Sequence, residues 1–181
     1  MARFYTPPDG GAIPGPTGPE GPQGPQGPQG EPGEGFTSFR GTIWRQTSGT
    51  VNIVTANVYV PINLTGTLNS STSLGMSLSG APNVSGLKNT SGETKMVAVI
   101  ATYDGKAGNN HAIGLKLALN NTPLDETECT SFGGGGGQFG KTMTQWILEL
   151  EPNDEITMWA ANKDTTDDLT IARYKMIAFA V

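Results

Sequence analysis

One segment of the sequence carries a pattern that binds phosphate groups in other proteins. Residues 135–142 read Gly-Gly-Gly-Gln-Phe-Gly-Lys-Thr and satisfy the spacing G-x-x-x-x-G-K-[ST]. Such a loop binds phosphate when it follows a buried strand and opens a helix whose N-terminal amides face the anion. Here the polar residues 126–132 precede it, and residues 143–151 alternate with the period of a strand. Because the glycine run 133–137 makes any glycine-based pattern easy to satisfy, the sequence favours a flexible surface loop over a nucleotide site.

Two other groups of side chains have types that could do chemistry. The single cysteine and the single histidine, Cys129 and His111, are a thiol and a base. Asp164, Asp167 and Asp168 could supply oxygen ligands to Ca²⁺. However, Cys129 has no other basic partner nearby in the sequence, and the aspartates lack the spacing of a calcium loop. We therefore expect a half-buried cysteine, a loop histidine and a solvated acidic turn, with no enzyme activity, metal or cofactor.

The composition argues against several classes of protein. The net charge of −5 divides into −3 for residues 1–35 and −2 for residues 36–181, so neither part has the basic surface of a nucleic-acid binder. No stretch approaches the roughly 20 apolar residues that cross a bilayer, and one cysteine cannot form an internal disulfide framework. The first residues lack the apolar region of a secretory signal, so we expect assembly in the cytoplasm of a host cell.

Residues 15–35 repeat with a period of three. Glycine begins seven successive triplets, and proline follows five of these glycines. Three extended chains can wind around one axis only if the axial residue has no side chain, and proline favours the extended conformation. The predicted axial residues are Gly15, Gly18, Gly21, Gly24, Gly27, Gly30 and Gly33. The repeat resembles collagen, and its prolines at the second triplet position match the collagen-like segments of phage and bacterial surface proteins. A disordered linker rich in proline and glycine is the alternative.

The repeat makes predictions about the segments on either side of it. At ~3.1 Å per residue, it would form a rod of roughly 65 Å. Seven triplets are too few to associate alone, so the domain that follows must hold three chains together. Residues 1–14 are predicted to be an extended arm in which Arg3, Phe4 and Tyr5 anchor the protein to a larger assembly. A frayed tail is the alternative for this arm.

Residues 36–181 predict an all-β domain of the sandwich or barrel type. Short runs rich in Thr, Val and Ile alternate with turn residues, and no helical periodicity persists. The expected strands are 42–44, 51–54, 74–78, 95–103, 112–119, 146–150, 156–160 and 169–181, with a hairpin turn at Asp104-Gly105. The last strand is apolar on both faces and so must be covered on both. We expect Met176, Ile177, Phe179 and Val181 to form the core of a trimer.

The last part of this domain resembles the C1q/TNF-like jelly roll in the form found at the tips of phage fibres. Four features carry the resemblance: strand 146–151, the turn Glu151-Pro152-Asn153-Asp154, Asn162 with the acidic loop 165–171, and the apolar terminal strand. The resemblance covers residues 144–181, whereas residues 36–143 agree only in the number of strands. It implies a homotrimer whose C-termini lie near the three-fold axis.

These segments together predict a structural virion protein of a bacteriophage, a trimeric fibre or a decoration of its capsid or tail. Residues 1–14 would attach it, residues 15–35 would form the shaft and residues 36–181 the head. Its partners would be two further copies, other virion proteins and a host-surface glycan or protein, but neither nucleic acid nor membrane. The candidate contact loop is Phe132, Gln138 and Phe139. The alternatives are an adhesive collagen-like filament of a bacterial or spore surface, and a polysaccharide hydrolase, which would need clustered carboxylates.

Overall fold

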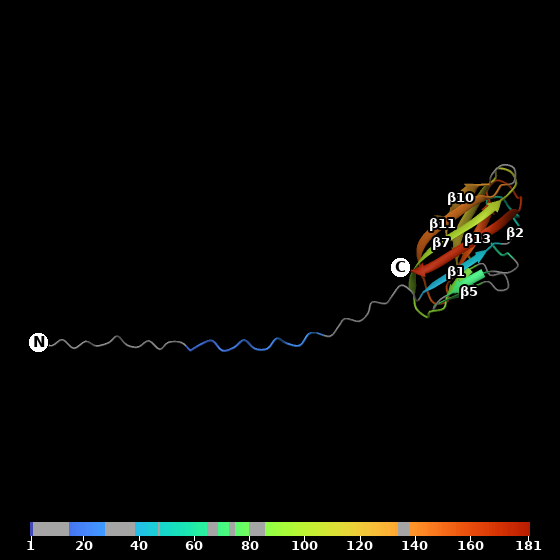
Figure 1. Ribbon diagram of the computed structural model, residues 1–181. Helices are drawn as coiled ribbons and strands as arrows, with labels where there is room; N and C mark the ends of the chain where they lie inside the picture. The colour runs from blue at the N-terminus through green and yellow to red at the C-terminus, as the bar shows by residue number, and fades with distance from the viewer. Residues whose placement is uncertain are drawn as a thin grey trace. The chain divides into compact units, whose positions relative to one another are not determined.

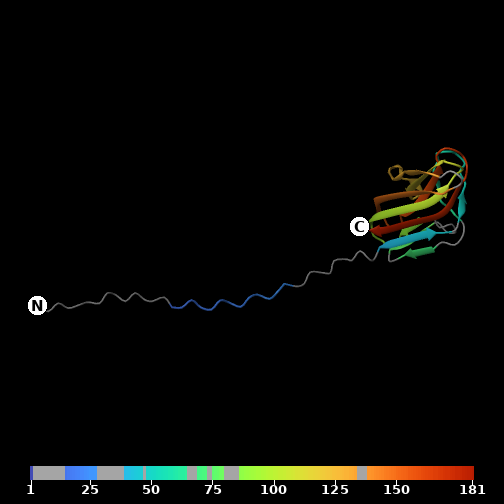
Figure 2. The ribbon, with the colours of Figure 1, turned by 45° about the horizontal axis from the view of Figure 1, so that its top comes forward.

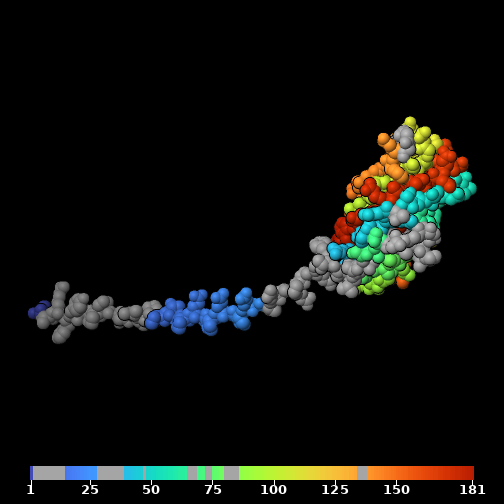
Figure 3. Space-filling model, turned by 45° about the vertical axis from the view of Figure 1, so that its right-hand side comes forward, coloured from blue at the N-terminus to red at the C-terminus, as the bar shows by residue number. Residues whose placement is uncertain are grey.

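The computed structural model divides the chain into two units, Met1–Gly33 and Glu34–Val181. The described residues are 1, 15–27, 39–46, 48–64, 69–72, 75–79, 86–133 and 138–181. In the first unit, residues 15–27 are extended and form neither helix nor strand (Figure 3). The predicted axial residues Gly30 and Gly33 and the predicted anchor Arg3, Phe4 and Tyr5 lie outside the described residues.

The second unit is a sandwich of two antiparallel sheets. Sheet A has the strand order β11-β7-β13-β1-β4, with β2 also paired to β13; Figures 1 and 2 show β11, β7, β13 and β1 side by side. Its strands are β1 Arg40–Arg45, β2 Gly49–Val51, β4 Asn69–Thr72, β7 Lys95–Lys106, β11 Gly140–Leu150 and β13 Leu169–Ala180. Sheet B has the order β10-β8-β12-β6-β5, with β3 on β12 and β9 on β8. Its strands are β3 Val60–Pro61, β5 Met76–Ser79, β6 Gly86–Asn89, β8 Ala112–Leu119, β9 Thr122–Pro123, β10 Cys129–Phe132 and β12 Glu155–Asn162.

One short 3₁₀ turn, η1 Asp125–Thr127, precedes β10, and the described residues contain no α-helix. Consequently no helix in the described part of the chain has the length and apolar character to cross a membrane. The predicted all-β class is confirmed.

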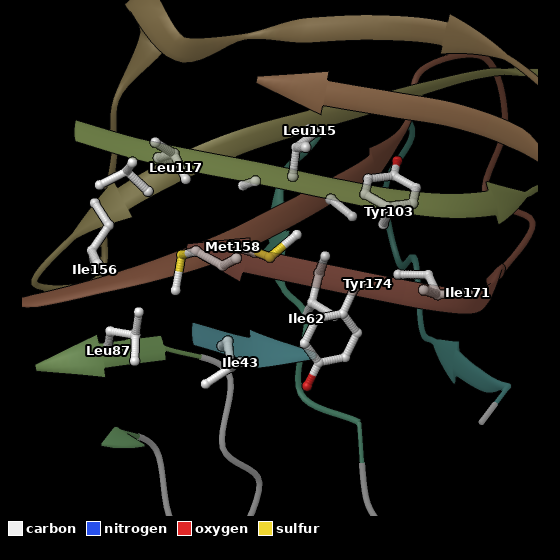
Figure 4. Close-up of a cluster of buried hydrophobic side chains, with 14 of the residues drawn as sticks. Ile43, Ile62, Leu87, Tyr103, Leu115, Leu117, Ile156, Met158, Ile171 and Tyr174 are labelled. Atoms are coloured by element: carbon white, nitrogen blue, oxygen red, sulfur yellow. The ribbon is translucent and has the colours of Figure 1, made fainter. Parts of the chain in front are cut away.

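Side chains from the inner faces of both sheets form one apolar core (Figure 4). Along β7 the inward residues alternate with outward ones, as a strand with one face on the core requires. Val97, Val99 and Tyr103 of β7 are at most 1% exposed. The Tyr103 hydroxyl donates a hydrogen bond of 2.8 Å to the Gly114 carbonyl in β8. This bond joins the two sheets through the core, where burial raises the pKa of Tyr103 and keeps the phenol protonated.

The prediction of a hairpin turn at Asp104-Gly105 is wrong. Strand β7 continues to Lys106, and the turn follows at residues 108–110. Gly105 lies inside the strand. A glycine is needed at this position because a Cβ would come within 2.6 Å of the Tyr103 ring. At this position the glycine therefore allows a side chain to approach the backbone closely, and it does not end the strand.

The turn predicted at Glu151–Asp154 is confirmed. Asn153 has a φ of 74°, in the left-handed region that asparagine tolerates better than most residues. The Glu151 amide donates to the Asp154 carboxylate at 2.8 Å, and the Asp154 amide donates to the Glu151 carbonyl at 3.0 Å. These bonds close the turn between β11 and β12, and so bring the chain from sheet A to sheet B.

Candidate functional site

The chain itself covers the outer face of sheet B. Seven of the eight residues of β8 are buried, including Lys116 at 8% exposure. The ring of Tyr59, from the segment that leads into β3, lies beneath the ammonium groups of Lys116 and Lys163, 4.4 and 5.1 Å from them. A Cβ at Gly114 would collide with the Tyr59 hydroxyl, so the glycine makes room for this ring.

Around this ring, two lysines and two carboxylates form a balanced cluster. Lys116 Nζ lies 2.7 Å from Asp125 and 2.9 Å from Glu128, and Lys163 Nζ lies 2.7 Å from Glu128. The hydrogen bonds from Lys163 and Lys116 lower the pKa of Glu128 to about 2. Burial acts against the charged form of Lys116, but its hydrogen bonds to Asp125 and Glu128 outweigh this and raise its pKa. Since the four charges cancel, the cluster leaves no net charge to attract a ligand. We interpret it as a structural ion-pair network that holds loops on sheet B.

In contrast, no described segment covers the outer face of sheet A, and much of this face is apolar. Outward-facing Met96, Met143 and Ile147 are 48%, 52% and 58% exposed. The other apolar residues on this face are half-buried Ala98 and Ile100 of β7 and Ile177 and Phe179 of β13. Hereafter, these seven residues are called the apolar face. A large exposed apolar surface of this kind marks a site of association.

The apolar face is hollowed rather than flat. A groove of about 520 Å³ runs over β11, β7 and β13 and is lined by Ile100, Trp146, Ile147 and Phe179, among others. A second hollow of about 500 Å³ lies between β13 and β1, where Ile177 and Phe179 form its apolar wall. These two hollows leave room on the apolar face for side chains of a partner.

Of the four residues predicted to form a trimer core, Met176 does not lie on the outer face. It is fully buried in the chain's own core, because alternate residues of β13 point toward sheet B. Ile177 and Phe179 are half-buried and point outward, and Val181 is 53% exposed at the end of the strand. Ile177, Phe179 and Val181 therefore remain predicted trimer-core residues. The prediction for Met176 is wrong, because this side chain belongs to the core of its own chain.

The predicted contact residues lie at the end of the head opposite the C-terminus. Register places Gly140 of β11 beside Gly105 of β7, whereas Ala180 lies beside Val97. Phe132 ends β10 with 72% exposure, and Gln138 and Phe139 are also exposed before β11 begins. The Lys106 ammonium lies 5.1 Å from the centre of the Phe139 ring. These two phenylalanines present aromatic surface to solvent at this end.

The described residues of the phosphate-loop pattern, 138–142, do not form the strand–loop–helix structure that phosphate binding requires. Residues 140–150, which contain its Lys141 and Thr142, form strand β11 of sheet A. Thr142 is buried, with its hydroxyl 2.6 Å from that of Ser131. No helix N-terminus follows the glycines, so the amides that cradle a phosphate in such loops are missing.

The other candidate chemical groups are separated from one another. Gly133, not Cys129, lies beside His111, since the Gly133 amide donates to the His111 carbonyl at 3.0 Å. Cys129 is four residues further along β10, about 13 Å away at the rise of a strand. His111 Nδ1 instead lies 3.2 Å from the Thr165 hydroxyl and 3.6 Å from the Asp167 carboxylate. A thiol–imidazole pair is therefore not formed.

The acidic loop uses its carboxylates to hold neighbouring backbone. The Ala112 amide donates to Asp164 at 2.6 Å, and the Ile53 amide donates to Asp168 at 2.9 Å. Buried Asn162 closes the loop by donating to the Thr165 hydroxyl and accepting from its amide. The described residues contain no cluster of three or more His, Cys, Asp or Glu side chains that could hold a metal ion. The aspartates thus bind different segments of the chain.

The head defined by these two sheets has the jelly-roll fold of tumour necrosis factor-like proteins, as predicted. It is similar to Eiger TNF from S. frugiperda, at a TM-score of 0.57 and 10% identity over 80% of this chain and 93% of the other. It is also similar to the PRD1 vertex protein P5, at a TM-score of 0.51 and 14% identity over 81% of this chain and 99% of the other. No protein-family model and no curated protein sequence matches the chain. At these identities, the likeness establishes the fold.

Proposed function

We propose that the protein is a trimeric structural component of a bacteriophage particle, a fibre or a decoration of the capsid or tail. Residues 1–14 attach it, residues 15–35 form a collagen-like shaft and residues 36–181 form the head. The observation that carries the proposal is the uncovered apolar face of sheet A in a TNF-like jelly roll. We assign this face to contacts between the three heads, because a monomer would leave it in water.

The glycines of the repeat support the same conclusion. A Cβ added at any of Gly15, Gly18, Gly21, Gly24 or Gly27 meets no atom within 4 Å. The head differs, because a Cβ at Gly86 would collide with the Ile156 carbonyl. Within one chain, no steric contact requires glycine at these positions of the repeat. A triple helix does require glycine there, because only glycine fits on its axis.

Attachment to a particle and display of the head complete the proposal. The similar fold of a PRD1 vertex protein supports a place in a virion. Three heads on one shaft would present three copies of Phe132 and Phe139. Simultaneous binding of the three copies raises the avidity although each individual contact stays equally weak. The acting groups are aromatic and apolar surfaces, so the proposed role is binding and not catalysis. Its targets would be a host-surface glycan or protein.

The molar mass of the full-length protein in solution tests the trimer. Light scattering should give three times 18.9 kDa. The variant Ile147→Asp, which places a carboxylate on the apolar face, should dissociate the trimer into folded monomers. The matched control is Val54→Asp, since Val54 is also apolar and 78% exposed but lies outside sheet A, and it should remain trimeric. A monomeric or dimeric wild type would overturn the proposal.

Electron microscopy with antibodies against the head tests the location. Labelling of phage particles at capsid, neck or tail supports the proposal. Labelling of filaments on bacteria or spores would replace it by the adhesive-filament alternative.

A further inference from the structure

Beside the apolar face, the half of sheet A nearer to Phe139 carries a cluster of cations. Lys141 of β11 lies opposite Asp104 of β7, and Asp104 lies opposite Arg173 of β13. Lys175 is two residues further along β13, on the same outward face, about 7 Å away. All three cations are exposed.

These side chains line a distinct hollow of about 240 Å³. Its wall also includes Trp44 and Thr102, which face outward from β1 and β7. The hollow has room for an oxyanion with several waters, since one water takes up about 30 Å³ of liquid.

The charge of this hollow is opposite to that of the whole protein. Its lining holds three outward-facing cationic side chains, Lys141, Arg173 and Lys175, and one carboxylate, Asp104. Asp104 is occupied by Arg173, whose Nε donates to it at 2.8 Å. These outward side chains have a formal charge of +2 within a chain whose net charge is −5.

We propose that this hollow binds a phosphate or sulfate group, either as a free ion or as a substituent of a sugar. Lysine and arginine donors converge on it from β11 and β13, and charge-assisted hydrogen bonds to oxyanions are stronger than those between neutral groups. Neither the apolar face nor the contact loop takes part, so this is a separate site on each chain.

The site also bears on the trimer, and this second step rests on the proposed function. If sheet A faces the other subunits, three such hollows lie on shared surfaces and their like charges repel. A bound anion in each would neutralise this repulsion, so phosphate would stabilise the trimer against heat.

Calorimetric titration of the full-length protein with inorganic phosphate, at constant ionic strength, tests the site. We expect one ion per chain, and a reduction in affinity of about tenfold or more for Lys175→Gln or Lys141→Gln, since each removes a charged donor. Asp104→Asn should strengthen binding, because it removes the carboxylate and releases Arg173. The matched control Lys88→Gln makes the same charge change in β6 of sheet B and should bind phosphate like the wild type.

Glucose 6-phosphate in place of phosphate distinguishes the two sources of the anion. Equal or tighter binding indicates a sugar-borne group at an open hollow, and binding of free phosphate alone indicates an enclosed ion. Absence of binding by both, or binding that the lysine variants and the control change equally, would overturn the site. The molar mass measured without phosphate decides the trimer independently.

Discussion

A single added methyl group in the shaft separates the two interpretations of the glycine repeat. Gly24 is the fourth of the seven repeated glycines, and a Cβ built there meets nothing within 4 Å in the single chain. If residues 15–35 were a lone linker, Gly24→Ala would be harmless. It would even reduce the freedom of the chain slightly, an effect worth at most about 1 kcal/mol.

In a triple helix, the same change places three methyl groups at the axis. Overpacking costs about 1–3 kcal/mol at each site, so the three chains together would lose about 3–9 kcal/mol. A rod of only seven triplets has little stability to spare. A triple-helical shaft should give its own thermal transition in the wild type. We expect this transition to disappear for Gly24→Ala, while the melting of the head stays unchanged.

Circular dichroism of the full-length protein during heating measures both transitions. Gln23→Ala, a change at a third triplet position that faces outward in a triple helix, is the matched control and should retain the shaft transition. If Gly24→Ala melts like the wild type and like this control, the chains are not wound around one axis, and the reasoning from glycine spacing fails.

Three further predictions concern the head. Tyr103→Phe should destabilise it by about 1–2 kcal/mol in urea unfolding, because the buried Gly114 carbonyl loses its donor; equal stability would show that this bond contributes nothing. Glu128→Gln should cost about 1–2 kcal/mol at pH 7, after allowance for the partial exposure of the pair with Lys163. Because the folded pKa of Glu128 is lowered, this contribution is complete above about pH 4.5 and declines toward pH 2, so wild type and variant should converge there in acid unfolding. Phe132→Ala should reduce attachment to host cells and change the unfolding free energy by no more than about 0.5 kcal/mol; undiminished attachment would exclude this side chain from the contact.

The strands that alternate strongly were predictable from the sequence because their period reflects burial of one face. Strand β8 was predictable because Ile and Leu alternate with Ala, Gly and Lys, although the structure covers both of its faces. The turn at Asn153 follows from turn chemistry. The hairpin at Asp104-Gly105 was mispredicted for a tertiary reason, since the glycine there accommodates the ring of Tyr103. Local sequence cannot distinguish a glycine that forms a turn from a glycine that leaves space for a neighbouring side chain.

The apolar face was only partly predictable. The rule that a strand apolar on both sides must be covered on both was applied to residues 176–181, and it identified Ile177 and Phe179. The same rule applied to the apolar run of β7 would have found Ala98 and Ile100. It could not separate Met176 from its neighbours, because only the orientation of β13 relative to sheet B decides which alternate residues enter the core.

The sequence by itself determined the period-three glycine repeat, the all-β class and the strands of the last forty residues, because these depend on local sterics and on alternation along one chain. Only the tertiary structure decided which face of which sheet stays uncovered and which distant cations meet. Lys141 and Arg173 are 32 residues apart and flank Asp104 because β7 lies between β11 and β13. Strand order and register, set by packing of the whole sandwich, bring such residues together, and no local pattern encodes them.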